Sequence, residues 1–136
     1  MKYLLDANCW IDHFRHGPAS NVTAHLAAEK PGNIYLCSLV VGELLYGVLR
    51  GAPEQQASNT ALVDSVRRRF VSLPFDDRAA EEYAKARVLL ASTGKPIGPN
   101  DLIIAAIAEA RGCTLVTHNT QEFSRMPGVP LVDWES

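Results

Sequence analysis

Four polar residues, each placed beside an apolar segment, carry oxygen donors that could share one site. They are Asp6, Glu43, Asp101 and Asn119. Carboxylates brought together raise one another's pKa, and a hard divalent cation removes that penalty. Carboxylate oxygens with water suit Mg²⁺ or Mn²⁺. Such a site can activate water and clamp phosphoryl oxygens during an in-line displacement, so the pattern indicates metal-dependent phosphate chemistry.

The segments that must position these residues alternate between short apolar runs and longer helical patterns. We expect strands at residues 2–5, 34–37, 71–75, 114–117 and 130–132, and helices at 9–16, 21–28, 39–49, 60–70, 77–92, 101–111 and 121–125. Residues 52–59 predict a polar linker, and Asn8 is expected to cap the first helix. The alternation is typical of an α/β fold with a parallel sheet and helices on both faces. Ligands of such sheets bind beyond the carboxyl ends of the strands, where Asp6 and Asn119 follow theirs.

The segment from Gly94 to Ala108 determines where Asp101 lies. Glycines and prolines at positions 94, 96, 98 and 99 predict an irregular loop, after which Asn100 is expected to cap a helix that opens with Asp101. The rest of this helix is almost wholly apolar, which predicts that it is buried. The positive end of a helix dipole favours a carboxylate. Asp101 is therefore either functional or an ordinary first-turn stabiliser.

Other candidates also have structural alternatives. Glu43 shares a helical face with Arg50, which is equally typical of a solvent-exposed stripe. Asn119 could simply form a turn. His13 and His16 are spaced like a metal-binding pair, but a solvated face is favoured because no third nitrogen or sulfur ligand is close in sequence.

Length and composition narrow the class of protein. The 136 residues predict one domain spanning residues 1–136. No apolar run reaches the roughly 20 residues of a membrane span, and Asp6 comes too early for a signal peptide. Three widely spaced cysteines indicate reduced core thiols, so we expect a cytoplasmic protein. With a net charge of −2 and a pI of about 6.1, a phosphate ligand would need a local basic patch or a metal ion.

Four short motifs occur in order along the chain. They are LLDAN at residues 4–8, LVVGEL at 39–44, GPNDLIIAA at 98–106 and LVTHNTQEF at 115–123. With the closing VDW at 132–134, they resemble PIN-domain ribonucleases, and more narrowly VapC toxins of type II toxin–antitoxin pairs. Each motif is weak alone, whereas four at these spacings are specific. The resemblance implies a three-layer α/β fold with a central parallel sheet in strand order 3-2-1-4-5.

The resemblance also implies an activity, a cofactor and partners. It implies an Mg²⁺-dependent endoribonuclease, often acting on tRNA, with Mn²⁺ able to substitute, and it implies a homodimer and a cognate antitoxin. By motif match, Asp6 and Asp101 are metal ligands, and Glu43 is a further ligand or a water-positioning acid. The family's fourth position is often Asp, whereas Asn119 stands here, which favours one Mg²⁺ over two. Glu122 lies nearby in sequence and could compensate.

We therefore expect hydrolysis of an RNA phosphodiester in a single-stranded loop. Water is the attacking group, so the products should carry 5′-phosphate and 3′-hydroxyl ends. Thr117 and Asn119 are expected to hydrogen-bond a metal-bound water or a phosphate oxygen. Lys95, Arg67 or Arg68 are expected to guide the RNA backbone, with a modest salt dependence.

Three alternative functions can be compared with the same residues. A phospho-acceptor receiver needs adjacent acids after the first strand and a late lysine, but Asp6 is followed by Ala7 and Asn8 and no lysine follows Lys95. A dinucleotide-binding domain is disfavoured because no Gly-x-Gly-x-x-Gly follows the first strand. A catalytically inactive PIN-like module that binds RNA or protein stays open, although the presence of all three acids argues against it.

Overall fold

A five-stranded sheet with all strands parallel forms the centre of the computed structural model, which describes all 136 residues. The strands are β1 (Tyr3–Leu5), β2 (Ile34–Cys37), β3 (Val71–Leu73), β4 (Thr114–Val116) and β5 (Leu131–Val132). Their order in the sheet is β3-β2-β1-β4-β5. The predicted α/β class and strand order are confirmed.

The central strand β1 is where the direction of chain connections reverses. Leu4 is fully buried and pairs with Tyr35 of β2 on one side and with Leu115 of β4 on the other. The chain moves from β1 through β2 to β3, and then crosses back to β4 on the opposite side of β1. A sheet of this kind leaves a crevice at the carboxyl ends of the strands flanking the reversal. Asp6 follows β1 at that crevice.

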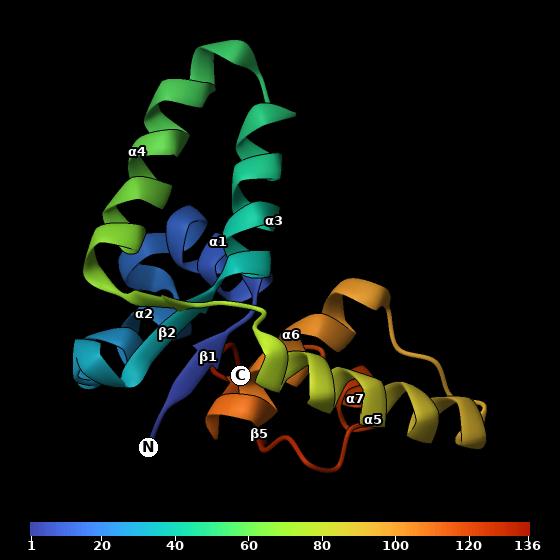
Figure 1. Ribbon diagram of the computed structural model, residues 1–136. Coiled ribbons are helices and arrows are strands. Elements are labelled where there is room, and N and C mark those ends of the chain that lie inside the picture. The colour runs from blue at the N-terminus through green and yellow to red at the C-terminus, as the bar shows by residue number, and fades with distance from the viewer.

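Seven α-helices cover the two faces of the sheet (Figure 1). They are α1 (Ala7–His16), α2 (Asn21–Ala28), α3 (Ser38–Leu49), α4 (Pro53–Arg69), α5 (Asp77–Thr93), α6 (Pro99–Arg111) and α7 (Thr120–Phe123). Short 3₁₀ turns, η1 (Gly17–Ala19) and η2 (Pro31–Asn33), follow α1 and precede β2. Because crossovers between parallel strands are right-handed, α1 to α4 lie on one face of the sheet and α5 and α6 on the other.

Helix α6 is the buried helix that the sequence predicts. Its residues from Ile104 to Ala108 are at most 1 % exposed, and α5 packs along it. It ends at Gly112, whose φ of 65° is in the left-handed region that glycine adopts without strain. The helix therefore runs back across the sheet with its N-terminus at the carboxyl edge, which places Asp101 on the same side as Asp6.

Three local predictions were wrong, each for a physical reason. Residues 52–59 are not a linker, because α4 begins at Pro53, a residue suited to the first helical position. The cap of α1 is Asp6 and not Asn8, and the N-cap position of α6 is Gly98 and not Asn100. In α6 a proline again occupies the first helical position.

Helices α3 and α4 lie side by side and project beyond the sheet as a hairpin (Figure 1). The buried residues of α4 are only Val63 and Val66, and both follow its first two turns. On α3, Tyr46 and Leu49 are 65 % and 70 % exposed. The hairpin therefore offers a large accessible surface next to the carboxyl edge of the sheet.

None of the helices has both the length and the apolar character needed to cross a bilayer. Cys9, Cys37 and Cys113 are buried and unpaired, as the sequence predicts.

Candidate active site

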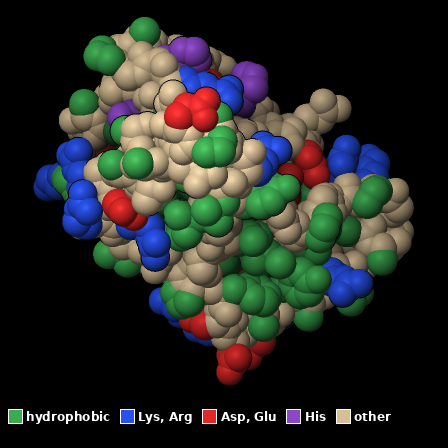
Figure 2. Space-filling view, turned by 90° about the horizontal axis from the view of Figure 1, so that it is seen from above, with side chains coloured by type: hydrophobic (Ala, Val, Ile, Leu, Met, Phe, Trp, Pro, Cys, Tyr) green, Lys and Arg blue, Asp and Glu red, His purple; other side chains and the backbone are tan.

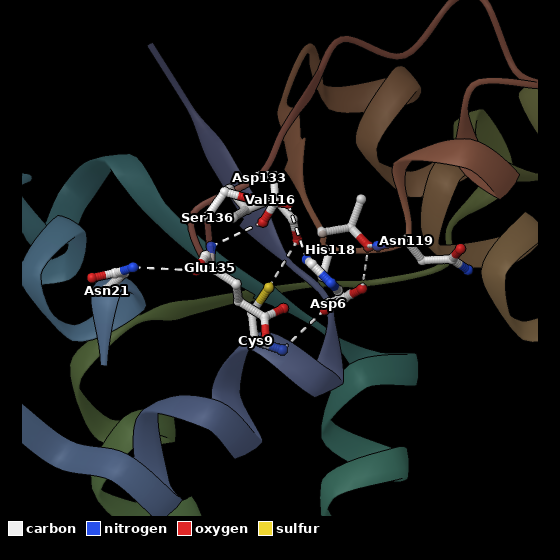
Figure 3. Close-up of polar contacts among 10 residues, drawn as sticks. Asp6, Cys9, Asn21, Val116, His118, Asn119, Asp133, Glu135 and Ser136 are labelled. Atoms are coloured by element: carbon white, nitrogen blue, oxygen red, sulfur yellow. Dashed lines mark hydrogen bonds and ion pairs between the residues drawn. The ribbon is translucent and has the colours of Figure 1, made fainter. Parts of the chain in front are cut away.

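Asp6 is fixed at the carboxyl end of β1 by three hydrogen bonds. Its backbone N–H donates to the Val116 carbonyl of β4 at 3.1 Å. Its Oδ1 accepts from the Cys9 N–H at 3.0 Å, which caps α1 (Figure 3). Its Oδ2 accepts from the Thr117 hydroxyl at 2.6 Å. The residue is only 7 % exposed. The direction of this carboxylate is therefore set by the sheet and the helix rather than by solvent.

Thr117 follows β4 and connects Asp6 to Asn119. Its buried hydroxyl donates to Asp6 and accepts from the Asn119 N–H at 3.0 Å. A hydroxyl has one proton to donate. Thr117 is therefore engaged with Asp6 rather than free to donate to a water or a phosphate oxygen, which differs from the role expected from the sequence. It positions two of the four predicted site residues.

Glu122 of α7 joins two segments that are far apart in the sequence. Its Oε1 accepts from the Gly98 N–H at 2.7 Å, and its Oε2 accepts from the Asn119 side-chain amide at 2.7 Å. The bond from Gly98, then that from Asn119, hold the pKa of Glu122 below its usual value. Glu122 therefore stays ionised at the mouth of α6, beside Asp101.

Asp101 and Glu43 are electrostatically coupled to the other acids of this edge. Burial, the largest cause, raises the pKa of Asp101 to about 6, and the charges of Glu122, Asp6 and Glu43 add to the rise. Burial also raises the pKa of Glu43; the nearby Asn100 side chain opposes this rise, and the charge of Asp6 adds to it. The smaller, charge-dependent rise in each pKa comes from repulsion between carboxylates that lie near one another. The structure thus brings Asp6, Glu43 and Asp101 to one edge of the sheet, with Glu122 among them.

The chemistry of this donor set fits a hard divalent cation. All of the donors are oxygens, and none of Asp6, Glu43 and Asp101 forms an ion pair with a lysine or arginine. These acids do not form a group of three donors within 4.8 Å of one another. Mg²⁺ binds through one or two carboxylates and keeps several waters, so it does not require a closed cage of protein ligands.

The basic residues near these acids are not the ones expected from the sequence. Arg67–Arg69 end α4 just before β3 begins, and so they lie at the amino edge of the sheet, opposite Asp6. Arg15 of α1 and Arg50 at the end of α3 instead line a hollow together with Glu43. The expectation that Arg67 or Arg68 guides the RNA backbone stays a prediction, and the structure places any such contact away from the acids.

A model of the PIN-domain family matches residues 3–129 of the chain. The chain belongs to the PIN-domain family.

Relatives of this PIN domain narrow the assignment. It is 34% identical over 134 residues to a protein of Shigella flexneri named tRNA(fMet)-specific endonuclease VapC, with 98% of each chain covered. A chain in the crystal structure of VapBC2 from Rickettsia felis, bound to a DNA fragment from their promoter, is 32% identical with a TM-score of 0.90, over 98% of this chain and 99% of that chain. A chain in the crystal structure of VapBC-5 from Mycobacterium tuberculosis, a member of the VapBC family of toxin-antitoxin systems, is 28% identical with a TM-score of 0.72. The match covers 97% of this chain and 96% of that chain. The predicted VapC ribonuclease family is confirmed.

This PIN domain also has a second group of side chains whose atoms could ligate a metal ion, and the sequence alone did not reveal it. His118, Asp133 and Glu135 present donor atoms within 4.8 Å of one another. His118 Nδ1 lies 3.0 Å from Asp133 Oδ2, and Asp133 also accepts from the Glu135 N–H and the Ser136 hydroxyl (Figure 3). The available signal was that Asp133 follows β5 as Asp6 follows β1.

Replacing Thr117 with Val in this PIN domain is expected to lower RNA cleavage about 10- to 100-fold, the range for groups that orient metal ligands. The substitution keeps the shape of the side chain but removes the donor to Asp6 and the acceptor for the Asn119 N–H. Initial cleavage rates at saturating Mg²⁺ would measure the effect. Thr117→Ser keeps the hydroxyl and should retain most of the activity, so equal losses in both variants would contradict the role assigned to the hydroxyl.

Proposed function

We propose that this PIN domain is a Mg²⁺-dependent endoribonuclease that hydrolyses tRNA, and that it is the toxin of a type II toxin–antitoxin pair. The observation that carries the proposal is the half-buried position of Asp101 among Glu122, Asp6 and Glu43, where burial first and then the charges of these acids raise the pKa of Asp101 to about 6. An enzyme that must bind a cation between nucleic-acid phosphate and protein benefits from carboxylates that lack cationic partners of their own.

Asp6 and Asp101 are proposed to hold the cation. When bound there, Mg²⁺ would lower the pKa of a coordinated water and neutralise charge on the scissile phosphate. Glu43 is proposed to orient the attacking water and accept its proton. The raised pKa of Glu43 makes this carboxylate a better base than an ordinary exposed glutamate.

Glu122 is proposed as the fourth acid of the site, with Asn119 orienting it. Asn119 was our sequence-based choice for the fourth position, but its amide nitrogen donates to Glu122 Oε2. Glu122 carries the charge that an asparagine lacks, and among the neighbouring carboxylates it raises the pKa of Asp101 the most. Asn119 would then act on the chemistry through Glu122 rather than as a metal ligand.

tRNA is proposed as the substrate because the Shigella flexneri relative is named for cleavage of tRNA(fMet). An antitoxin partner is proposed because the structural relatives are VapBC proteins.

We also propose a homodimer and a cytoplasmic location. Hydrophobic side chains gather in a broad patch on the face shown in Figure 2. Val88 and Leu89 of α5 are 72 % and 43 % exposed, as expected of residues covered by another chain.

The proposed function is tested by incubating the purified, antitoxin-free protein with total small RNA in Mg²⁺ and in EDTA. Discrete cuts that require Mg²⁺ are expected, with 5′-phosphate ends that a ligation assay detects. Cuts that persist in EDTA would overturn the metal requirement. Ends carrying a 2′,3′-cyclic phosphate would show attack by the 2′-hydroxyl and contradict water as the nucleophile. RNA binding without any cut would favour the inactive binding module.

A further inference from the structure

A groove of about 430 Å³ runs from the acidic site along α3, between α1 and the mouth of α6. Glu43 and Asn100 line one end of this groove, and Tyr46 and Arg50 line the other. Glu43, Tyr46 and Arg50 are three and four residues apart, so they share one face of α3. At a rise of about 1.5 Å per residue, this face extends roughly 10 Å from the acidic site.

The Tyr46 side chain is not needed by the protein core. Leu44 and Val48 of α3 face the core and are nearly fully buried, whereas Tyr46 is 65 % exposed. The guanidinium carbon of Arg50 lies 5.3 Å from the centroid of the Tyr46 ring. Arg50 forms no ion pair with a carboxylate. The far end of the groove therefore offers a largely exposed aromatic ring with an uncompensated cation over one of its faces.

We propose that this end of the groove is a subsite for an unpaired RNA nucleotide, with its base stacked on Tyr46 and its phosphate bound by Arg50. The proposal rests on the proposed ribonuclease function and specifies how its substrate is held. Single-stranded RNA is recognised by stacking of unpaired bases on aromatic side chains combined with basic groups along the backbone. An arginine beside the aromatic ring serves both interactions, because it also attracts the stacked π-system.

Charge favours RNA over a protein segment as the occupant. The chain has a net charge of −2, yet the hollow that adjoins the groove between α1, α3 and α4 is lined by both Arg15 and Arg50. Glu43 lines both the groove and this hollow, so the two cations flank the proposed catalytic acids. An RNA backbone that extends beyond the acidic site would therefore lie next to positive charge. This suits a substrate that carries a negative charge on every nucleotide.

The subsite is tested by fluorescence anisotropy with a labelled, unstructured RNA oligonucleotide, using Asp101→Asn as the background so that the RNA stays intact. Tyr46→Ala is expected to raise Kd about 5- to 100-fold, the range for loss of one base–aromatic stack. Tyr46→Phe keeps the ring and should bind nearly as the parent does. Leu49→Ala is the matched control, because Leu49 is also exposed on α3 but does not line the groove. Arg50→Gln should lower the slope of log Kd against log salt by about one.

Three results would overturn the subsite, two from binding and one from kinetics. An unchanged Kd in Tyr46→Ala would exclude stacking, and a change of oligomeric state in that variant with unchanged RNA affinity would show a protein interface instead. Equal weakening by Tyr46→Phe and Tyr46→Ala would show that the ring face is not what RNA contacts. In otherwise wild-type protein, Tyr46→Ala should raise KM with little change in kcat. Efficient cleavage with unchanged KM would refute the subsite alone, whereas RNA binding that depends on Tyr46 without any cleavage would refute the proposed ribonuclease alone.

Discussion

Asp101→Asn is expected to reduce RNA cleavage by more than about 100-fold, because groups that merely orient metal ligands already account for roughly 10- to 100-fold. The substitution keeps the shape of the side chain and removes one of the two carboxylates proposed to hold the cation. Single-turnover cleavage at saturating Mg²⁺ gives the rate, and isothermal titration with Mg²⁺ reports the loss of the ligand directly. Glu81→Gln, which changes an exposed acid of α5, is the matched control and should leave both unchanged.

The same substitution is expected to stabilise the metal-free protein at neutral pH. The pKa of Asp101 is about 6 in the folded protein, above its usual value of 3.8, so between these values the folded state binds more protons than the unfolded state. Stability from this group is therefore present at low pH and is lost as the pH rises through about 6. In EDTA, Asp101→Asn should have a higher Tm than the parent at pH 7, and the difference should shrink near pH 4.

The opposite signs of the two effects make the assignment of Asp101 testable in one variant. A substitution that only damaged the fold would lower both activity and Tm. A lower Tm in EDTA at pH 7 together with cleavage within a few-fold of the parent would show that Asp101 is the ordinary first-turn stabiliser that the sequence left open.

Trp10→Ala is expected to lower the free energy of unfolding by about 3–5 kcal/mol, the usual loss for truncation of a buried aromatic ring. Trp10 is the largest of the fully buried side chains, and its ring lies 5.4 Å from that of Phe70, measured between centroids. This contact joins α1 to the segment that leads into β3. Urea unfolding measures the effect as a lower midpoint with an unchanged slope.

Trp10→Phe is the control for that prediction. The smaller ring can keep the contact with Phe70, and the indole N–H, which has no hydrogen-bond partner within the protein, is removed. The loss should therefore be well below that of the alanine variant. Equal losses would mean that the whole indole, rather than ring contact with Phe70, holds α1 in place.

Most of the framework could be predicted because periodicity and turn residues act locally. The apolar runs of β1, β2 and β4 and the glycine stop at Gly112 are strong local signals. The start of α4 was missed because its first two turns are polar and pack against little. There Pro53 was the available signal, and in α6 Pro99 was the corresponding one, since proline fits the first position of a helix. The strand order came from the family resemblance and not from periodicity.

The site was harder to predict because its contacts join segments that are far apart in sequence. The alignment of Asp6 with Asn119 could be anticipated, because the carboxyl ends of neighbouring parallel strands meet. The hydrogen bond between Gly98 and Glu122 could not be anticipated, because it depends on the path of the loop before α6. The same holds for Arg15, whose position beside Glu43 depends on how α3 packs against α1.

Asp6 follows β1, caps α1 and belongs to the proposed active site. This overlap of roles limits which residues can replace it during evolution. Asparagine caps a helix about as well as aspartate, whereas alanine weakens the cap by about 1 kcal/mol. A descendant that lost catalysis but kept its fold should therefore retain aspartate or asparagine at position 6. Position 101 makes no capping bond in α6, so it is free to vary widely once selection for cleavage ends. Comparing variation at these two positions among decayed copies would separate selection for folding from selection for chemistry.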